Sequence, residues 1–175
     1  MNPPSEDWRE LDENCHRLQH VETERKFLVT SDAWRDQAVS SAAIEQFYLG
    51  VTDPVVVRVR TYGDEAFLAV KSRRRGLSRV EIESPVSPTF VAAIRDTGLH
   101  LASPVRKTRH RVPVGAFVFE VDEYAGHNAG LVVAEIEIPS ADTGFSHPEW
   151  LGEEVSDQPR YGNFALALRP YDSWE

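Results

Sequence analysis

The sequence predicts a mainly β protein of the α+β class, built from about eight antiparallel strands. Eight short stretches rich in Val, Ile, Phe or Tyr alternate apolar and polar residues, a pattern typical of strands. Turn signals such as TYGDE, SRRRG and AGHNAG separate several of them, as expected for antiparallel neighbours. Eight is close to the number of strands at which a sheet can close into a barrel with a narrow interior.

The predicted strands follow one another along the chain with few interruptions. They cover residues 21–29, 44–49, 55–62, 66–71, 79–84, 105–112, 116–124 and 131–138.

One helix is predicted from clear end signals. Residues 87–97 begin with Ser87 as a helix cap and Pro88 in the first turn, and Gly98 follows as a stop signal.

Three other segments also have helical features. Residues 31–42 start with a Ser/Asp cap and predict a second helix, and residues 161–168 predict one or two late turns. Residues 6–19 contain helix-forming residues but little apolar face, so they form either a loose helix or a tail.

The bulk composition predicts one cytoplasmic domain. A chain of 175 residues, 41% hydrophobic and 27% charged, can bury a core of its own and is short for two domains. A single cysteine, Cys15, excludes a disulfide framework within the chain. The first 20 residues have no apolar region typical of export signals, and no run of eighteen apolar residues predicts a membrane span.

The charges are unevenly distributed along the chain. The net charge is −9, but residues 1–20 carry −3 and residues 140–175 carry −5. The segment between them, residues 21–139, is nearly neutral at −1, with 15 Lys and Arg against 16 Asp and Glu. We therefore expect both signs of charge to lie close together in the middle of the chain.

Charged residues recur two positions apart within otherwise apolar strands, so each set points to one face of its strand. These residues are Glu22, Glu24 and Lys26, Arg58 and Arg60, Lys71, Arg79, Glu81 and Glu83, Lys107 and Arg109, Glu120 and Asp122, and Glu135 and Glu137. The opposite face of the same strands is apolar enough to be a packed core.

Two interpretations fit this pattern. The first is a sandwich with an apolar inside and a charged, solvated outside, as is common in antiparallel sheets. The second is a water-filled tunnel, because a dry interior would cost several kcal/mol per buried ion. The second is favoured because Glu, Asp and Arg dominate the charged face, and because whole strands carry charges of one sign. Clustered carboxylates suit Mg²⁺ or Mn²⁺, and an array of Arg and Lys suits a chain of phosphates.

Ordered motifs along the chain resemble those of the CYTH superfamily, also called triphosphate tunnel metalloenzymes. E-T-E-R-K at 22–26 resembles the E-x-E-x-K signature of this superfamily. The resemblance continues through Q-F-Y-L (46–49), V-R-V-R (57–60), L-A-V-K (68–71), G-L-S-R-V-E-I-E (76–83), K-T-R (107–109), F-E-V-D-E-Y (119–124), G-L-V-V-A-E-I-E (130–137), W-L-G-E-E-V (150–155) and Y-G-N-F-A-L (161–166). It places a single CYTH-like domain at residues 21–175 and leaves residues 1–20 as an N-terminal extension.

The resemblance implies an eight-stranded antiparallel closed barrel, a few flanking helices and metal-dependent chemistry on triphosphates inside a tunnel. The implied metal ligands are Glu22, Glu24, Asp122, Glu135 and Glu137, holding Mg²⁺ or Mn²⁺, two ions per site. The implied substrate-binding residues are Lys26, Arg58, Arg60, Lys71, Arg79, Lys107 and Arg109, with Glu81 and Glu83 as further tunnel acids. The implied catalytic set is Glu22, Glu24, Lys26, Arg58, Arg60 and Lys71.

The expected reaction is hydrolysis of inorganic triphosphate to pyrophosphate and phosphate. Three alternatives stay open: an adenylyl cyclase, a thiamine or nucleoside triphosphatase, and a polyphosphate-binding module without catalysis. No nucleic acid or membrane partner is expected, and the oligomeric state is left open, a homodimer included.

Overall fold

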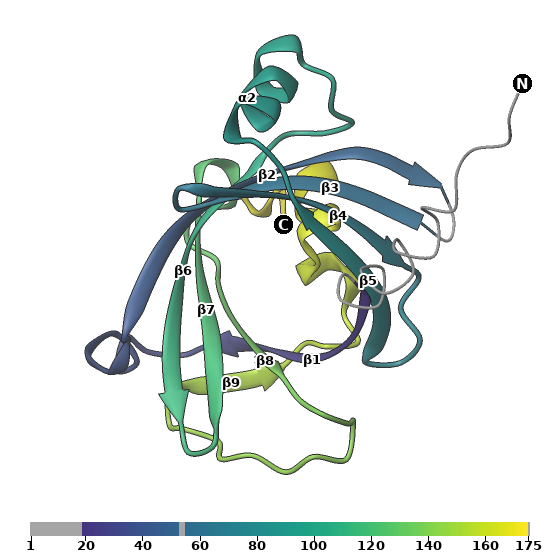
Figure 1. Cartoon of the computed structure of the whole chain (residues 1–175). Coiled ribbons are helices and arrows are strands. Elements are labelled where there is room, and N and C mark those ends of the chain that lie inside the picture. Colours follow the sequence, from purple (N-terminus) through teal and green to yellow (C-terminus); the bar gives the residue numbers. More distant parts are fainter. Residues whose placement is uncertain (1–18, 53–54, 175) are drawn as a thin grey trace, which may run out of the picture.

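Eight strands close into a barrel in the computed structural model, which describes residues 19–52 and 55–174 (Figure 1). The ring consists of β1 (Gln19–Val29), β5 (Ser78–Pro85), β4 (Glu65–Ser72), β3 (Val55–Tyr62), β2 (Ser40–Thr52), β6 (Val105–Val114), β7 (Phe117–Ala125) and β8 (Val132–Glu137). All neighbours pair antiparallel, and β8 returns to β1. The predicted strands and the closed barrel are thereby confirmed.

Strand β1 joins three neighbours and completes the ring. Its first half, from Gln19 to Thr23, pairs with β5, and the side chains of Thr23 and Ser78 share a hydrogen bond of 2.8 Å across this seam. From Glu24 onward β1 pairs with β8. The pairing with β5 ends at Thr23, and the same edge of β1 then pairs with a ninth strand, β9 (Leu151–Glu154). The alternation pattern did not predict this short strand.

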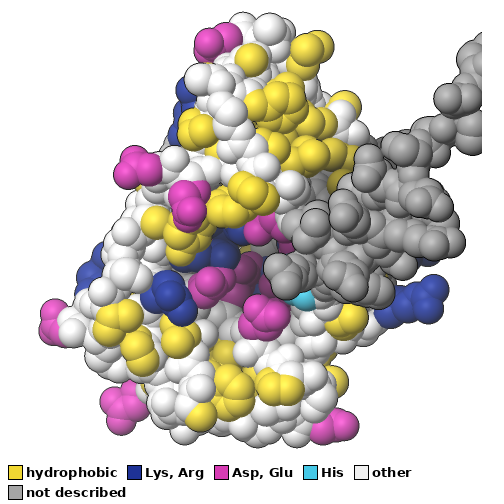
Figure 2. Space-filling model, viewed as in Figure 1, with side chains coloured by type: hydrophobic (Ala, Val, Ile, Leu, Met, Phe, Trp, Pro, Cys, Tyr) yellow, Lys and Arg dark blue, Asp and Glu magenta, His cyan; other side chains and the backbone are white. Residues whose placement is uncertain are grey.

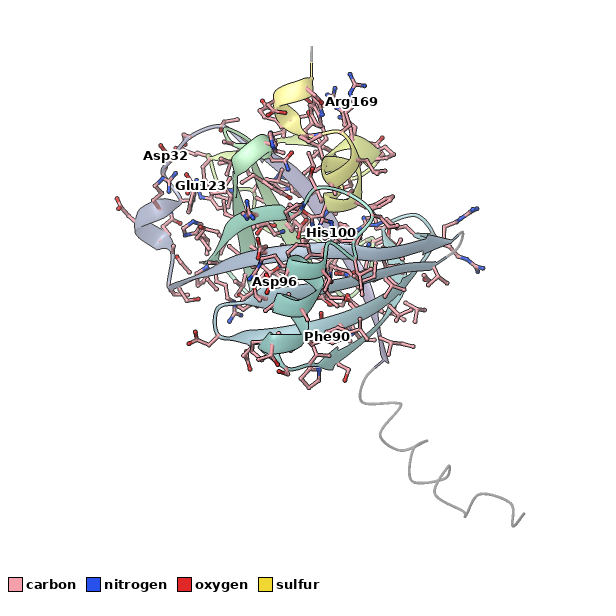
Figure 3. All side chains as sticks on the ribbon, turned by 90° about the horizontal axis from the view of Figure 1, so that it is seen from above. Asp32, Phe90, Asp96, His100, Glu123 and Arg169 are labelled. Carbon is pink, nitrogen blue, oxygen red and sulfur yellow. The ribbon has the colours of Figure 1, made fainter. Side chains whose placement is uncertain are left out.

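Among the described residues no helix is part of the ring of strands: one packs on its outer wall, and the C-terminal one, yellow in Figure 1, lies at one end of the barrel. The helix α2 (Pro88–Thr97) has the predicted signals: the Ser87 hydroxyl accepts a hydrogen bond from the Thr89 amide at 3.1 Å, and Gly98 is left-handed with φ 67°. Figure 3 shows α2, marked by Phe90 and Asp96, against the outer surface of the barrel. The predicted late turns at 161–168 are confirmed as α3 (Asn163–Leu168). The other helical pieces are single 3₁₀ turns, namely η1 (Arg35–Gln37), η2 (Gly126–Asn128), η3 (Pro159–Tyr161) and η4 (Tyr171–Ser173).

The helix predicted at residues 31–42 is wrong. Only η1 forms there, and Ser40 already pairs with Arg111 as the start of β2. Trp34 is buried in the core at the foot of this turn. Cross-strand pairing and the burial of Trp34 thus outweigh the local helix signal. The loose helix or tail predicted at residues 6–19 lies outside the described residues, except that Gln19 belongs to β1.

Two of the three apolar clusters of this protein lie outside the barrel wall, and the third lies at one end of the barrel. One apolar cluster includes Phe27, Trp34, Phe119, Ile136 and Trp150 and sits between the barrel wall and the connections that cover it. A second cluster packs α2 against the wall. The third includes Tyr48, Tyr124, Val133 and Leu166 and holds the C-terminal segment. Because the apolar faces of the strands pack outward, the charged faces turn inward.

Candidate active site

The barrel encloses a cavity of about 160 Å³ lined almost entirely by charged side chains. The lining residues are His20, Glu22, Glu24, Lys26, Arg58, Arg60, Lys71, Arg79, Glu81, Glu83, Lys107, Arg109, Glu120, Glu135, Glu137 and Asn163. Looking along the barrel, Figure 2 shows acidic side chains gathered in a hollow, with basic side chains deeper and a histidine at the rim. Residues from seven strands therefore meet in one charged space.

Thirteen of the fourteen predicted site residues line this cavity. The exception is Asp122, whose side chain has no exposed surface. Its carboxylate accepts hydrogen bonds from Lys107 and from Arg109, whose Nε and Nη2 both lie at 2.7 Å. The structure therefore places Asp122 behind the lining, where it holds two basic residues in position.

Sequence reasoning missed three lining residues of this cavity. Glu120 was recognised as one half of a charged pair with Asp122 but was not included in the site, and His20 was assigned to the extension. Asn163 belongs to the Y-G-N-F-A-L motif at the start of α3. Its amide is uncharged, so a prediction based on charged positions does not find it.

A second cavity, of about 280 Å³, adjoins the first and shares several of its residues. Tyr48, Arg74, Ser156 and Phe164 are among the residues found only in its wall. Arg74, from the SRRRG loop, contacts the carboxylate of Glu24. The basic loop between β4 and β5 thus contributes a side chain to the end of the tunnel.

Arginine and lysine side chains within the cavity are held by its carboxylates. Arg58 Nη2 donates to Glu81 at 3.2 Å and to Glu83 at 3.0 Å, and Arg60 Nη2 donates to Glu83 at 3.2 Å. Lys71 donates to Glu81 at 2.7 Å. These contacts fix the basic groups in place before any ligand is bound.

Two buried donors in this group make no hydrogen bond within the described part of the chain. They are the Nε atoms of Arg58 and Arg60, adjacent on the inward face of β3. A buried N–H without an acceptor costs free energy, and an anion in the cavity would supply the acceptor.

At the opposite wall, Lys26 and Arg109 converge on Glu135. Lys26 contacts the carboxylate directly, and Arg109 Nη2 donates to it at 2.7 Å. Burial alone would raise the pKa of Glu135, but Lys26, Arg109 and Lys107 lower it well below its usual value. Glu135 is therefore ionised throughout the neutral range.

The pKa values of Glu22 on β1 and Lys71 on β4 are also strongly shifted. Burial would raise the pKa of Glu22, yet Lys71 and Arg79 outweigh it and lower the value to about 2. Burial, followed by repulsion from Arg58 and Arg79, lowers the pKa of Lys71 to about 8.

Two carboxylates at the acidic side show the opposite shift. Burial, followed by repulsion from Glu22, raises the pKa of Glu137. Burial also raises the pKa of Glu120 against the attraction of Arg109, with a further contribution from the repulsion of Glu135 and Asp122. This crowding of negative charge is the kind that a bound cation relieves.

The donor set fits a hard divalent cation, although no ligand shell is already assembled. In the register, Glu24 faces Glu137 across β1 and β8, and Glu120 faces Glu135 across β7 and β8. Among the described residues no three acids, histidines or cysteines stand close enough to form a ready metal site, because Lys and Arg side chains occupy several carboxylates. Carboxylate oxygens are the ligands that Mg²⁺ and Mn²⁺ prefer.

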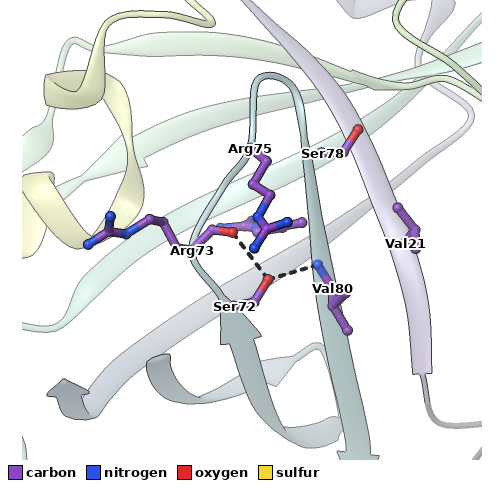
Figure 4. A pocket seen from close by; sticks show the side chains of 7 residues that line it. Val21, Ser72, Arg73, Arg75, Ser78 and Val80 are labelled. Carbon is purple, nitrogen blue, oxygen red and sulfur yellow. Dashed lines mark hydrogen bonds between the residues drawn. The ribbon is translucent and has the colours of Figure 1, made fainter. Parts of the chain in front are cut away.

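A larger cavity, of about 720 Å³, lies elsewhere, on the outer side of the β4–β5 hairpin (Figure 4). Its wall includes Val21, Arg75, Ser78 and Val80, and it shares only Arg79 with the tunnel. It has no carboxylate among its described lining residues, so it lacks the paired acids and bases of the barrel interior.

No helix in the described part of the chain has the length and apolar character needed to cross a bilayer.

Comparison with known proteins identifies relatives over most of the chain. The model of the CYTH domain matches residues 20–171. An inorganic triphosphatase of Acetivibrio thermocellus is 36% identical over 154 residues, which are 88% of this chain and 97% of that protein. An inorganic triphosphatase of Nitrosomonas europaea is 38% identical over 153 residues, 85% of this chain and 97% of that protein.

Solved structures share the fold. The crystal structure of an inorganic triphosphatase superposes with a TM-score of 0.63 at 34% identity, covering 84% of this chain and 94% of the other. A protein from Pyrococcus horikoshii has a TM-score of 0.54 at 19% identity, covering 69% and 80%, and shows the same fold. With the family model spanning the whole barrel, the chain belongs to the CYTH family.

Proposed function

We propose that this protein hydrolyses inorganic triphosphate to pyrophosphate and phosphate with the help of a divalent metal ion. The observation that carries the proposal is the array of seven Lys and Arg side chains that line the inner cavity, among which Arg58 and Arg60 each have a buried Nε without a hydrogen-bond partner in the described part of the chain. Such an array suits a linear chain of phosphates, whose oxygens accept hydrogen bonds along its whole length. The two relatives that match 97% of their own length, both named inorganic triphosphatase, support this choice.

Each side of the cavity would have its own task. The phosphate chain would be gripped by Lys26, Arg58, Arg60, Lys71, Arg79, Lys107 and Arg109. Glu81 and Glu83 would act through the arginines they hold, since both accept hydrogen bonds from Arg58. Fixed charges of this kind stabilise the transferring phosphoryl group without rearranging during the reaction.

The metal would be Mg²⁺ or Mn²⁺, two ions per site, held by Glu22, Glu24, Glu135 and Glu137. When bound, it would neutralise charge on the phosphate oxygens and lower the pKa of the attacking water. Water adds to the phosphorus of a terminal phosphate, the bond to the bridging oxygen breaks, and pyrophosphate leaves. The proton of the water passes to a carboxylate or to solvent.

The character of the wall favours inorganic triphosphate over an organic one. Every lining residue of the inner cavity except Asn163 is ionisable, so this wall offers charge and almost no apolar surface for a base or a thiamine ring, and the aromatic side chains of Tyr48 and Phe164 line only the adjoining cavity. Inorganic triphosphate requires only charge and hydrogen bonds.

The test is release of phosphate from inorganic triphosphate, ATP and thiamine triphosphate, each with Mg²⁺ and with Mn²⁺. We expect turnover of inorganic triphosphate in the presence of metal and none in EDTA. No release from any of the three would overturn the proposal and favour a binding module. Cyclic AMP and pyrophosphate formed from ATP would identify a cyclase instead.

Variants test the metal assignment within the same assay. Glu22→Gln and Glu24→Gln should each lower kcat/KM on the order of 100-fold, because the amide cannot replace a charged ligand. Glu65→Gln removes the same charge from an exposed position of β4 outside both tunnel cavities and should have no effect. Unchanged metal-dependent turnover in the first two variants would show that these ligands are wrongly assigned.

A further inference from the structure

The C-terminal segment contributes to the wall of the tunnel, although the pattern of charged residues does not predict this contribution. Six residues line both the inner and the second cavity, namely Glu24, Lys26, Arg58, Lys71, Arg79 and Asn163. Five of them come from barrel strands, and Asn163 alone comes from α3. It is also the one residue of the inner lining that cannot ionise.

The orientation of the Asn163 amide is set by the barrel. The hydroxyl of Tyr124, buried on β7, donates to Asn163 Oδ1 at 2.7 Å. The oxygen is therefore the group directed at the wall, and the amide nitrogen with its two N–H donors is left for the cavity. That nitrogen has no hydrogen bond to any residue that the structure describes.

The position of α3 is secured from two further directions. The ring of Phe164 meets the ring of Tyr48 edge-on, with centroids 5.0 Å apart. Just before α3, the Lys26 amide donates to the Ser156 hydroxyl at 3.0 Å, and the Val155 amide donates to the Lys26 carbonyl at 2.8 Å. The segment that carries Asn163 is thus tied to the same strand that carries Glu24 and Lys26.

We propose that Asn163 contacts the substrate: its amide nitrogen donates to an oxygen of the phosphate chain at the end of the tunnel that α3 borders. Tyr124 is the positioning residue that keeps the amide turned toward the cavity. The inference rests on the proposed function and deepens it. Unlike most of the lining bases, which already donate to carboxylates, this donor carries no charge and is not committed to an acid.

The chemical reason for such a donor is that the lining is already balanced in charge. Seven carboxylates face seven Lys and Arg side chains in the inner cavity. A neutral N–H can bind a phosphate oxygen without breaking an existing ion pair. The amide therefore recognises the phosphate end through geometry, whereas the arginines hold it through charge.

The experiment measures the binding of inorganic triphosphate by calorimetry in EDTA, where no turnover occurs, and then kcat and KM with Mg²⁺. Asn163→Ala removes the donor, and we expect Kd and KM to rise about 10-fold with kcat within about threefold, because the contact is made before and during reaction. Asn163→Asp keeps the acceptor for Tyr124 but replaces the donors with a negative charge, so the rise should be larger. Gln37→Glu makes the same amide-to-carboxylate exchange on the exposed η1 turn and should leave both constants unchanged.

Tyr124→Phe tests the positioning role separately. It removes the hydroxyl and frees the amide to turn, so KM should rise less than in Asn163→Ala, and combining the two substitutions should add nothing further to KM. A fall in the thermal midpoint of Tyr124→Phe without a change in KM would show that Tyr124 has a structural role only. That result would overturn its role in positioning the Asn163 amide.

Two outcomes separate this inference from the proposed function. Triphosphate bound by Asn163→Ala and Asn163→Asp within twofold of the unaltered protein would overturn the contact, whatever the activity. A protein that binds triphosphate but releases no phosphate would overturn the hydrolase, while a loss of binding in Asn163→Ala would still support the contact.

Discussion

Lys71 is the residue whose protonation should respond most clearly to substrate. Burial and the neighbouring guanidinium groups of Arg58 and Arg79 lower its pKa to about 8, although Glu81 accepts its hydrogen bond. A bound polyanion favours the charged amine and raises the pKa again. In the free protein at pH 8.5, about three quarters of the Lys71 side chains should be neutral, and binding should return the missing protons.

We therefore predict proton uptake when inorganic triphosphate binds at pH 8.5. Calorimetry in buffers with different ionisation enthalpies measures the number of protons taken up. Lys71→Arg stays charged and should take up fewer, and the difference between the two proteins cancels any proton that the triphosphate itself gains or loses. Equal proton counts would show that Lys71 is not the group that titrates.

Because Asp122 lies behind the cavity wall, we predict that its substitution affects stability. Its fully buried carboxylate holds Lys107 and Arg109, so Asp122→Asn leaves two buried cations with a weaker acceptor. The free energy of unfolding should fall by about 3 to 5 kcal/mol, as measured by urea denaturation.

Metal affinity decides between the two roles of Asp122. If it serves as an anchor, the concentration of Mg²⁺ that gives half-maximal activity should stay within a fewfold of the original in Asp122→Asn. A rise by orders of magnitude would instead restore Asp122 to the metal ligands.

At the scale of residues, most of the side chains that line the cavity could be predicted from the sequence. Charges spaced two apart predict which side chains share a face, and the structure brings thirteen of the fourteen predicted residues to one cavity. The alternation assigns Asp122 and Glu120 to the same face of β7, but it cannot predict that Glu120 lines the cavity while Asp122 is fully buried behind it. It also could not find Asn163, because its importance depends on where α3 ends up relative to the barrel.

Among the elements, β9 packs against β1 without space for a side chain at one position. A Cβ added at Gly152 would lie 2.7 Å from Thr30 Cγ2 and 3.0 Å from the Leu28 carbonyl oxygen. Gly152→Ala should therefore push β9 away from β1 and lower the free energy of unfolding by about 1 to 3 kcal/mol.

Gly50 on β2 provides the matched control. A Cβ added there meets nothing within 4 Å, so Gly50→Ala should leave stability unchanged or raise it slightly. Thermal unfolding of the two variants gives the comparison. Equal midpoints would show that β9 moves aside at no cost.

Element prediction failed where tertiary contacts decide the structure. Residues 31–42 carry a helix cap, yet Arg35 instead bridges Asp32 and Glu123, seen on the same side of the barrel in Figure 3. β9 is only four residues long and pairs at two positions, too few to produce an alternation pattern. By contrast α2 was predictable, since both of its end signals are local.

For the whole molecule, the balanced lining has an energetic consequence. Seven acids against seven bases attract a polyanion alone, or a cation alone, less strongly than they attract the two together. Bound together, triphosphate and metal neutralise each other as well as their partners. We predict that the imido analogue of triphosphate, which resists hydrolysis, and Mg²⁺ together raise the thermal midpoint by more than the sum of their separate effects.

Sodium sulfate at equal ionic strength is the control for general salt stabilisation. Shifts that simply add would contradict the coupling between the two ligands.

The charge pattern favours a tunnel, but the closed eight-stranded ring itself could be inferred from the sequence only through the resemblance to a family. Alternation and strand count are equally compatible with a sandwich, and the pairing of β1 with β5 joins segments some sixty residues apart. No local signal encodes that seam.

The closed ring also sets when the protein can begin to work. The cavity draws side chains from β1, at the start of the described chain, and from Asn163, close to its end. A nascent chain emerging from the ribosome therefore has no complete tunnel until every segment from β1 to α3 is free to fold. Fragments released early, by pausing or by proteolysis, should carry charged strands but no place to bind a phosphate chain.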